Sequence, residues 1–245
     1  MKSALVTGAN KGIGLEVAKL LAQHGFFVYI GSRTLENGQA AVAKLQAAGL
    51  TNLEAVQLDV TQPDSIQAAR AAIGAKTPVL DVLVNNAGIS GDLAQSACQT
   101  TLDQYQAVFA TNVFGVAGVT QAFLDLLEQS PQPRIVNVST AMASLTLFAD
   151  FENPNSAFRV PVYQASKSAL NMYTLNLAYE LRDTPFKVNA VCPGYTQTDF
   201  TGHQGTSTVE EAGQRILKYA LLGPDGPTGK YFSEEYFPAP ATCPW

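Results

Sequence analysis

Short apolar runs alternate with helical patterns along the chain, and this alternation limits the fold more than any other feature of the sequence. The runs are rich in Val, Ile and Leu, as in SALVTG at the start of the chain and RIVNVST past its middle. Such strands are typical of a parallel sheet that is buried on both faces. Their alternation with helices predicts an α/β fold: a single Rossmann-type, doubly wound parallel sheet with helices on both faces.

The expected elements cover most of the chain. The expected strands are SALVTG, FFVYIGS, LEAVQLDV, VLDVLVNNAG, RIVNVST and FKVNAVCPG, with GKYFSEE as a last short strand. The expected helices cover 14–24, 35–48, 63–73, about 102–111, 113–128, 160–181 and 207–221. The last helix is expected to open with a capping box formed by Ser207 and Glu210.

Composition narrows the class of protein. A chain of 245 residues, 47% hydrophobic and 14% charged, suits one large α/β domain over residues 1–245, or at most two small ones. A net charge of −5 argues against a nucleic-acid partner. Two histidines and three cysteines without CxxC spacing predict no metal site and favour a reducing, cytoplasmic location. No apolar run reaches the roughly 18 residues of a membrane helix, so no membrane partner is expected.

A glycine-rich turn, TGANKGIG at residues 7–14, joins the first strand to the first helix. Gly8 permits a tight turn, Gly12 lets the backbone approach a pyrophosphate, and Gly14 lets helix and strand pack closely. The helix that follows would offer its free N–H groups to the phosphates. An ordinary glycine-rich turn is the alternative reading of this motif.

Four further stretches follow in order: NNAG at 85–88, VST at 138–140, YQASK at 163–167 and PGYTQT at 193–198. Together with the Gly-x-x-x-Gly-x-Gly spacing of the turn, they resemble the short-chain dehydrogenase/reductase family over nearly the whole chain. Within the family, TGANKGIGLEVAKLLA, SRTLENGQAAVAKLQAAG and GPDGPTGKYFSEE are similar to the carbonyl reductases. This resemblance implies reduction of a ketone or aldehyde with NADP(H), or the reverse oxidation.

The resemblance also implies which residues hold the cofactor. For the residues at strand ends, the alternative to cofactor binding is a role in a plain turn, and for Asp59 it is a cap on the helix that begins at Pro63. The implied residues are Gly8, Asn10, Lys11, Gly12, Ile13 and Gly14 of the turn, then Arg33, Asp59, Val60, Asn86, Ala87, Gly88, Tyr163, Lys167, Pro193, Gly194, Thr196 and Thr198.

Tyr163 and Lys167 are four residues apart, so they share one face of a helix. Hydride attack on a carbonyl leaves negative charge on oxygen, which requires a proton donor. A phenol with a pKa near 10 lies about three units, or about 4 kcal/mol, from neutrality. A lysine charge about 4 Å away is worth about 4 kcal/mol at an effective dielectric of about 20, so Lys167 is expected to lower the pKa of Tyr163.

Three more residues are expected to assist catalysis. The family carries a serine hydroxyl at the end of the fifth strand, and its position corresponds to Thr140, although the preceding Ser139 is an alternative. Both hydroxyls could instead satisfy backbone groups at the strand end. Asn112 in TNVFG matches the family asparagine that helps to hold a water near the lysine, or else is a polar helix residue.

The second strand ends in YIGSRT, with Arg33 and no carboxylate at its tip, and Lys11 adds a second cation. Both cations could instead be solvated surface charges, and Glu36, a little further on, is the one feature that could argue for NAD. An arginine at this place accommodates the 2′-phosphate of NADP, whereas an acidic residue would select NAD. We therefore expect an NADPH-dependent carbonyl reductase that acts on a small carbonyl or alcohol substrate. An alcohol dehydrogenase working oxidatively and a non-catalytic dinucleotide-binding regulator are the alternatives. Self-association stays open. Family members associate through helices on one sheet face, but the longer stretch before Tyr163 could interfere with that association.

The stretch from Thr140 to Tyr163 is several residues longer than the common family spacing. It contains Phe148, Phe151 and Phe158, which either line a substrate pocket or pack within a surface excursion.

Overall fold

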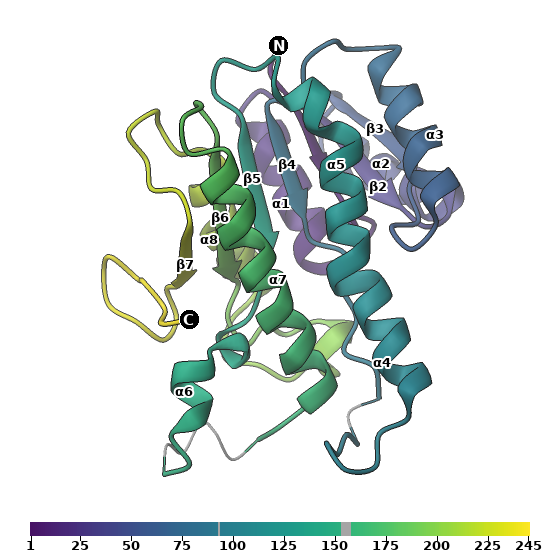
Figure 1. The fold of residues 1–245 in the computed structure, drawn as a ribbon. Coiled ribbons are helices and arrows are strands. Elements are labelled where there is room, and N and C mark those ends of the chain that lie inside the picture. The colour runs from purple at the N-terminus through teal and green to yellow at the C-terminus, as the bar shows by residue number, and fades with distance from the viewer. Residues whose placement is uncertain (93, 153–157) are drawn as a thin grey trace.

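Seven parallel strands form one sheet in the computed structural model, which describes residues 1–92, 94–152 and 158–245 (Figure 1). The order across the sheet is β3-β2-β1-β4-β5-β6-β7. The strands are β1 (Ser3–Val6), β2 (Phe27–Ser32), β3 (Leu53–Gln57), β4 (Val82–Asn85), β5 (Arg134–Val138), β6 (Lys187–Cys192) and β7 (Lys230–Ser233). The order reverses between β1 and β4, and the carboxyl ends of strands at such a point form the usual ligand crevice of this architecture.

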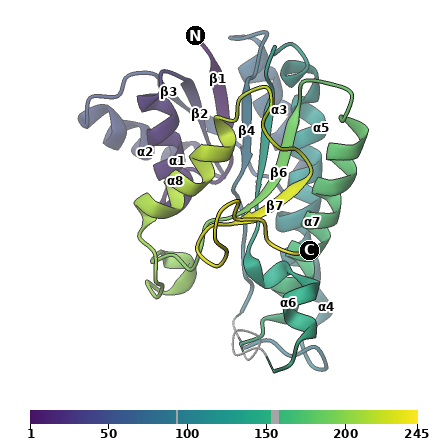
Figure 2. The same cartoon turned by 90° about the vertical axis from the view of Figure 1, so that its left-hand side faces the viewer.

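Helices cover both faces of the sheet, which confirms the predicted doubly wound fold. In Figure 2, α1, α2 and α8 lie on one side of the sheet, and α3, α5 and α7 lie on the other. The helices on the first side are α1 (Gly12–Gln23), α2 (Leu35–Ala47) and α8 (Val209–Ala220). Those on the second side are α3 (Pro63–Gly74), α4 (Leu102–Phe109), α5 (Gly115–Leu127) and α7 (Pro161–Glu180), with the short α6 (Leu145–Ala149) beyond the sheet edge.

The core is divided by the sheet into two apolar layers. Val6, Val28 and Val84 face α1 and α8, whereas Leu5, Leu83 and Ile135 face α5 and α7. This alternation along each strand explains the continuous apolar runs in the sequence, because both faces of each strand are buried.

One continuous helical run replaces the two helices expected near residue 112. A π-helical turn, η1 (Ala110–Phe114), joins α4 directly to α5. Asn112 lies within this turn, where its side chain is fully buried. Single π turns are common at functional sites because the extra residue changes the direction of a side chain.

The joined run Leu102–Leu127 is long and apolar enough to cross a membrane, since it contains an 18-residue window with a mean hydropathy of 1.5. The sequence prediction that no segment reaches this length was therefore wrong, because it treated the run as two helices. Core helices of soluble proteins have the same length and composition, and Val119, Phe123 and Leu127 are fully buried against the sheet. Within the fold, 39% of the apolar window is buried.

The predicted capping box of α8 is displaced by one residue. Thr208 accepts from the N–H of Glu211, and the Glu211 carboxylate accepts from the N–H of Thr208 at 2.8 Å. Ser207 instead donates to Glu235 at 2.9 Å. Ser207 also lies beside Thr196 in an isolated parallel bridge, so the helix begins only after it.

Candidate active site

The predicted catalytic side chains meet where β5 ends and α7 begins. Thr140 follows β5 directly, and it caps a short 3-10 turn, η2 (Ala141–Ala143), by accepting from the N–H of Met142 at 3.3 Å. Its hydroxyl also lies close enough to the phenol of Tyr163 to lower the pKa of that phenol. The Lys167 ammonium lies one helical turn further on, 6.0 Å from the centre of the Tyr163 ring. Phenol, hydroxyl and ammonium therefore form one cluster.

Burial controls the ionisation of this cluster. Burial raises the pKa of Tyr163 well above its ordinary value, and the hydrogen bond from Thr140 opposes that rise. Burial also lowers the pKa of Lys167 from 10.5 to about 8. The predicted lowering of the Tyr163 pKa by Lys167 was therefore wrong for this structure, because desolvation dominates the shift and Lys167 is not among the groups that cause it.

The end of β5 holds the Lys167 side chain in place. Its side chain is 4% exposed, and its ammonium donates to the backbone oxygen of Val138 at 2.8 Å. Ser139 points away from the cluster and donates to the amide oxygen of Asn171. The geometry thus places Thr140, rather than Ser139, beside the phenol.

Asn112 braces the chain that follows β4. Its amide oxygen accepts from the N–H of Ile89 at 2.9 Å, and its amide nitrogen donates to the oxygen of Ile89 at 2.8 Å and to Ser166 at 3.0 Å. A Cβ on Gly88 would lie 3.3 Å from the Asn112 oxygen and 3.5 Å from the Lys167 ammonium. The structure therefore brings Gly88 and Asn112 to the lysine, and the role of Asn112 in holding a water stays a prediction.

The end of β4 is fastened to the glycine turn. Thr7 accepts from the N–H groups of Asn86 and Ala87, both at 3.0 Å. The amide of Asn86 donates to the backbone oxygens of Thr7 and Gly8. Gly8 has a φ of 61°, and a Cβ there would lie 2.9 Å from the Cα of Ala87, so only glycine fits. The two motifs form one rigid crevice wall.

The glycine turn has the shape that a dinucleotide requires. Gly12 has a φ of 56°, and a Cβ on it would meet nothing closer than Thr198 at 3.7 Å. The side chain of Lys11, at the N-cap of α1, makes no capping hydrogen bond, so the first N–H groups of the helix have no side-chain acceptor. Open space beside free N–H groups fits a pyrophosphate. Ile13 packs against the core beneath the turn.

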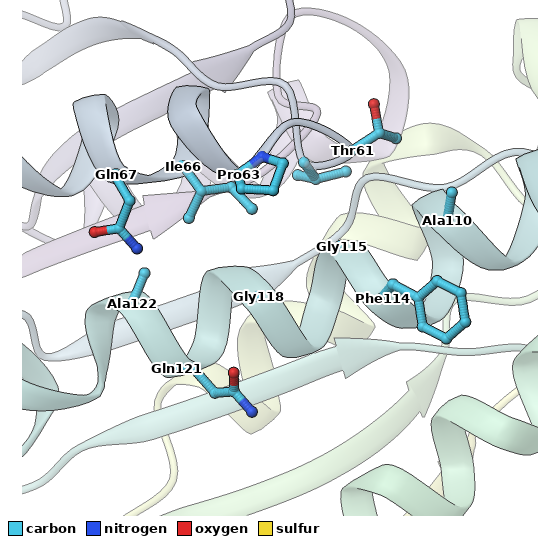
Figure 3. Close-up of a pocket in the computed structure, with 11 residues that line it drawn as sticks. Thr61, Pro63, Ile66, Gln67, Ala110, Phe114, Gly115, Gly118, Gln121 and Ala122 are labelled. Atoms are coloured by element: carbon cyan, nitrogen blue, oxygen red, sulfur yellow. The ribbon is translucent and has the colours of Figure 1, made fainter.

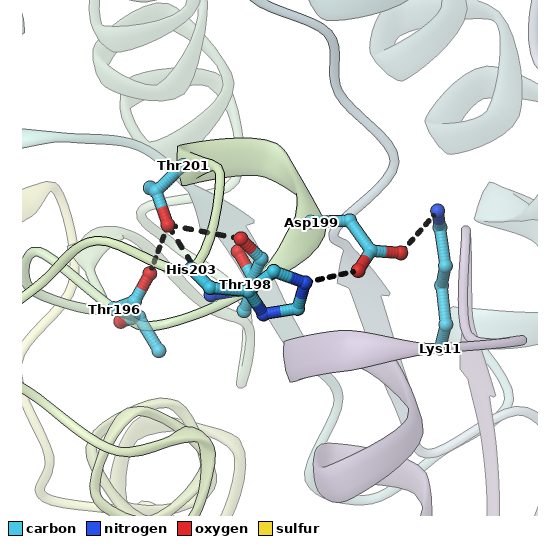
Figure 4. Close-up of polar contacts among 6 residues, drawn as sticks. All are labelled: Lys11, Thr196, Thr198, Asp199, Thr201 and His203. Carbon is cyan, nitrogen blue, oxygen red and sulfur yellow. Dashed lines mark hydrogen bonds and ion pairs between the residues drawn. The ribbon is translucent and has the colours of Figure 1, made fainter.

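The predicted phosphate-binding cations lie at the outer end of this crevice. Arg33 is exposed just beyond β2, and its guanidinium is free of hydrogen bonds to the described residues. Lys11 forms an ion pair of 2.7 Å with Asp199, which also lies 3.2 Å from His203 (Figure 4). A hollow of about 390 Å³ adjoins Lys11. It is lined by Asn10, Lys11, Gly12, Leu15, Asn37, Ala40, Ala41 and Lys44.

Asp59 and Val60 lie just past β3, and their contact with the cofactor stays a prediction. Asp59 accepts from the N–H and the hydroxyl of Thr61, so it stabilises a turn rather than capping α3, whose N-cap is Gln62. Val60 borders a second hollow of about 390 Å³ between α3 and α5, which also contains Phe114, Gly115 and Gly118 (Figure 3). None of the predicted catalytic residues lines this hollow.

The loop after β6 is held by two charged side chains that the sequence reading did not single out. Arg215 donates to the oxygen of Pro193 at 2.6 Å, and Glu235 accepts from the N–H of Tyr195 at 2.7 Å. Burial opposes the ionisation of Glu235, but hydrogen bonds from Thr206, the Tyr195 N–H and Ser207 keep its pKa below the ordinary value. A Cβ on Gly194, with a φ of 92°, would collide with both side chains.

Thr196 and Thr198 shape the rest of this loop. The Thr201 hydroxyl donates to the oxygen of Thr196 at 2.7 Å, and the N–H of Thr198 donates back to that hydroxyl at 3.2 Å (Figure 4). The resulting turn places the Phe200 ring 5.6 Å from the Tyr163 ring. Phe200 is thus a neighbour of the phenol that the sequence motifs gave no reason to expect.

The aromatic residues before α7 pack mainly around one cation. The Arg159 guanidinium lies 5.4 Å from the ring centres of both Phe148 and Phe151. Phe158 is exposed, and residues 153–157 of the predicted excursion lie outside the described part of the chain. The contacts match the surface-excursion reading for Phe148 and Phe151.

Comparison with known proteins defines the class. The short chain dehydrogenase family matches residues 2–208. A short-chain dehydrogenase of Penicillium roqueforti, anuI, is 35% identical, and the match covers 94% of this chain and 93% of that protein. The (-)-isopiperitenone reductase of Mentha piperita is 32% identical over 95% of this chain and 96% of its own length. The structure of an NADPH-bound carbonyl reductase from chicken fatty liver superimposes with a TM-score of 0.86 at 29% identity, covering 100% of this chain and 99% of that one.

This chain belongs to the short-chain dehydrogenase/reductase family. It is accordingly an oxidoreductase of the kind that binds a nicotinamide dinucleotide and acts on small molecules.

Proposed function

We propose that the chain reduces a ketone or aldehyde to an alcohol, with NADPH as the hydride donor. The observation that carries the proposal is the cluster of Tyr163, Thr140 and Lys167, in which the Thr140 hydroxyl acts on the phenol and the Lys167 ammonium lies 6.0 Å from its ring. Two hydroxyl groups converge at the end of β5, so a carbonyl oxygen placed there would receive two hydrogen bonds as it becomes negative.

The side chains account for the proton and the charge. Bound nicotinamide supplies the hydride that adds to the carbonyl carbon. Tyr163 donates its phenolic proton to the carbonyl oxygen, and the phenolate that remains is reprotonated from solvent. Thr140 accepts from the Met142 N–H, so its own proton is directed toward the phenol and can be donated to a substrate oxygen that binds beside Tyr163. The ammonium of Lys167 stabilises the transient phenolate.

The ionisation of Tyr163 favours the reductive direction. Reduction uses the protonated phenol, and burial keeps this form by raising the pKa of Tyr163. Oxidation would require the phenolate as a base, which the same burial disfavours. The relatives named for isopiperitenone and salutaridine reduction support the same direction.

The positive charges at the outer end of the cofactor crevice favour NADPH over NADH. Arg33 stands at the tip of β2, Lys11 and Lys44 line the adjacent hollow, and no carboxylate takes the place of Arg33. Glu36 lies in the first turn of α2, where it complements the helix dipole. The NADPH-bound state of the similar carbonyl reductase supports this preference.

A panel of ketones, aldehydes and quinones with NADPH consumption as the readout tests the proposal. Tyr163→Phe should lower turnover by about 10²–10⁴ and leave NADPH binding intact, because only the proton donor is lost. Tyr179→Phe, at an exposed position of the same helix, is the matched control and should retain full turnover. Near-normal turnover in Tyr163→Phe would refute the mechanism, and binding of NADPH without turnover of any substrate would favour the regulator reading.

A further inference from the structure

Helix α7 carries Tyr163 but begins without a cap of its own. Its N-cap is Val160, which has no polar side chain, and its first residue is Pro161, which has no N–H. Helix starts usually satisfy their free N–H groups with a Ser, Thr, Asp or Asn side chain at the N-cap. Gln164 accepts from the N–H of Val160 at 2.9 Å. The N–H groups of Val162 and Tyr163 therefore need an acceptor from elsewhere in the chain.

Gln95 provides that acceptor from the loop between β4 and α4. Its amide oxygen accepts from the N–H of Val162 at 2.9 Å and from the N–H of Tyr163 at 3.3 Å. Its amide nitrogen donates to the backbone oxygens of Ser90 at 2.6 Å and Asp92 at 2.7 Å. These four bonds use the two donors of the amide and both lone pairs of its oxygen, so they also fix the orientation of the amide.

The loop that carries Gln95 is itself anchored at the active site. Asn112 binds both the N–H and the oxygen of Ile89, the residue just before Ser90. Gln95 thus joins a segment that is fixed beside Lys167 to the backbone of Tyr163. Loss of this bridge would free the first turn of α7, from which the phenol projects toward Thr140.

We propose that Gln95 is a positioning residue for catalysis, which caps α7 from a distance and holds the Tyr163 phenol in register with Thr140. This inference rests on the proposed carbonyl reduction. Among the described residues, every hydrogen bond of the Gln95 side chain goes to a backbone group, so it acts through Tyr163 and not on the substrate.

Two substitutions of Gln95 test its acceptor and donor hydrogen bonds separately. Gln95→Met keeps the length of the side chain but removes all four hydrogen bonds. Gln95→Glu keeps an acceptor for the helix N–H groups, where a negative charge is favourable, but loses both donors. Gln99→Met is the matched control, because Gln99 is exposed in the same loop and no hydrogen bond of its side chain joins the described residues.

We expect Gln95→Met to lower kcat by about tenfold to a hundredfold, because a misplaced catalytic group loses rate on this scale. The Kd for NADPH should change by less than about twofold, and Gln95→Glu should recover most of the lost kcat. Hydrogen exchange of the Val162 and Tyr163 amides should accelerate in Gln95→Met, stay close to wild type in Gln95→Glu, and be unchanged in Gln99→Met.

Unchanged hydrogen exchange at these amides in Gln95→Met would overturn the proposal that Gln95 caps α7. Faster exchange with an unchanged kcat, or an equal loss of kcat in the Glu and Met variants, would overturn the positioning role. If the wild-type protein reduced no carbonyl compound, the proposed function would fail, and the catalytic role of Gln95 with it. The exchange comparison would still decide the cap in that case, because it needs no substrate.

Discussion

The Ser139 hydroxyl donates a hydrogen bond of 2.7 Å to the amide oxygen of Asn171, and both side chains are buried. Ser139 is therefore engaged in joining the end of β5 to α7. Thr140, one residue further along, turns to the opposite side and meets the Tyr163 phenol. Because the Ser139 hydroxyl is bound to Asn171, Thr140 carries the hydroxyl that is available for chemistry.

Thr140→Ala should lower kcat/KM by about 10²–10³, as the loss of one donor to a developing oxyanion does. Ser139→Ala should leave kcat/KM within a few-fold and lower the free energy of unfolding by about 1–3 kcal/mol, because it leaves the Asn171 oxygen buried without a donor. Thr140→Ser restores the hydroxyl and should restore most of the activity. Steady-state kinetics and urea unfolding of the three variants measure both quantities, and the reverse ranking in kcat/KM would contradict the assignment of Thr140.

The sheet and the order of the motifs could be predicted from the sequence because both depend on local patterns. A strand buried on both faces must be apolar throughout, and Gly8 and Gly12 are required where the backbone adopts a positive φ. Neither conclusion needs knowledge of distant contacts. The motif residues then meet because they follow strands whose carboxyl ends share one edge of the sheet.

The supporting contacts could not be predicted, because they join residues far apart in sequence without a local signal. Gln95 lies 68 residues before Tyr163, and Glu235 lies 40 residues after Tyr195. Either residue alone reads as a surface polar group. The direction of the pKa shift of Tyr163 was missed for a related reason, since burial of the phenol depends on the packing of α7 and the turn that carries Phe200.

The pH dependence of reduction should follow Lys167. Burial lowers its pKa to about 8, so the ammonium is charged below that pH and neutral above it. Because the charged form supports the phenolate, kcat/KM should fall as the pH rises through about 8. If the pKa of this lysine had its ordinary value of 10.5, kcat/KM would stay level to well above pH 9. Rates with saturating NADPH from pH 6 to 10 test this, and a rate that stays level to pH 10 would contradict it.

Stability should change in the opposite direction over the same range. The unfolded chain binds the lysine proton more tightly than the folded chain does, so the contribution of Lys167 to stability rises between about pH 8 and 10.5. The difference in free energy of unfolding between wild type and Lys167→Met isolates this contribution. An increase of that difference in favour of wild type from pH 7 to pH 10, while activity falls, would show that the loss of activity is not unfolding.

Tyr231, on the edge strand β7, should support Thr140. Its side chain is fully buried, its phenol donates to the backbone oxygen of Thr140, and its ring stacks on Trp245 at 5.3 Å. Tyr231→Phe should lower the free energy of unfolding by about 1–3 kcal/mol, because it removes a buried donor. It should also lower kcat/KM, because the backbone of Thr140 loses its tether.

Tyr219→Phe is the matched control for Tyr231. Tyr219 is also buried and stacked, against Phe232, and donates to Glu234 at 2.9 Å, but it lies on α8 on the other face of the sheet. A similar loss of stability with unchanged kcat/KM is expected for it. Equal kinetic effects of the two substitutions would indicate general destabilisation and not support of Thr140.

Cofactor choice should depend on three charged residues at the mouth of the crevice. Arg33 can bond a 2′-phosphate with its fork of donors, so Arg33→Asp should weaken NADPH strongly and NADH little. Lys11 is expected to contribute to the same recognition, yet its ammonium is paired with the Asp199 carboxylate at 2.7 Å. Both side chains are more than half exposed, so solvent weakens this pair and a phosphate can displace the carboxylate.

Asp199→Asn should therefore lower the Kd for NADPH several-fold, because Lys11 gains a free charge and a carboxylate leaves the neighbourhood of the phosphates. The effect should fall as salt rises, since exposed charges are screened. In Lys11→Met the further change Asp199→Asn should have less effect, because the partner that it frees is missing. Fluorescence titration of NADPH and NADH against the single and double variants measures these values. Equal use of both cofactors by the wild type, or tighter NADH binding in Asp199→Asn without tighter NADPH binding, would contradict the assignment of these cations to the 2′-phosphate.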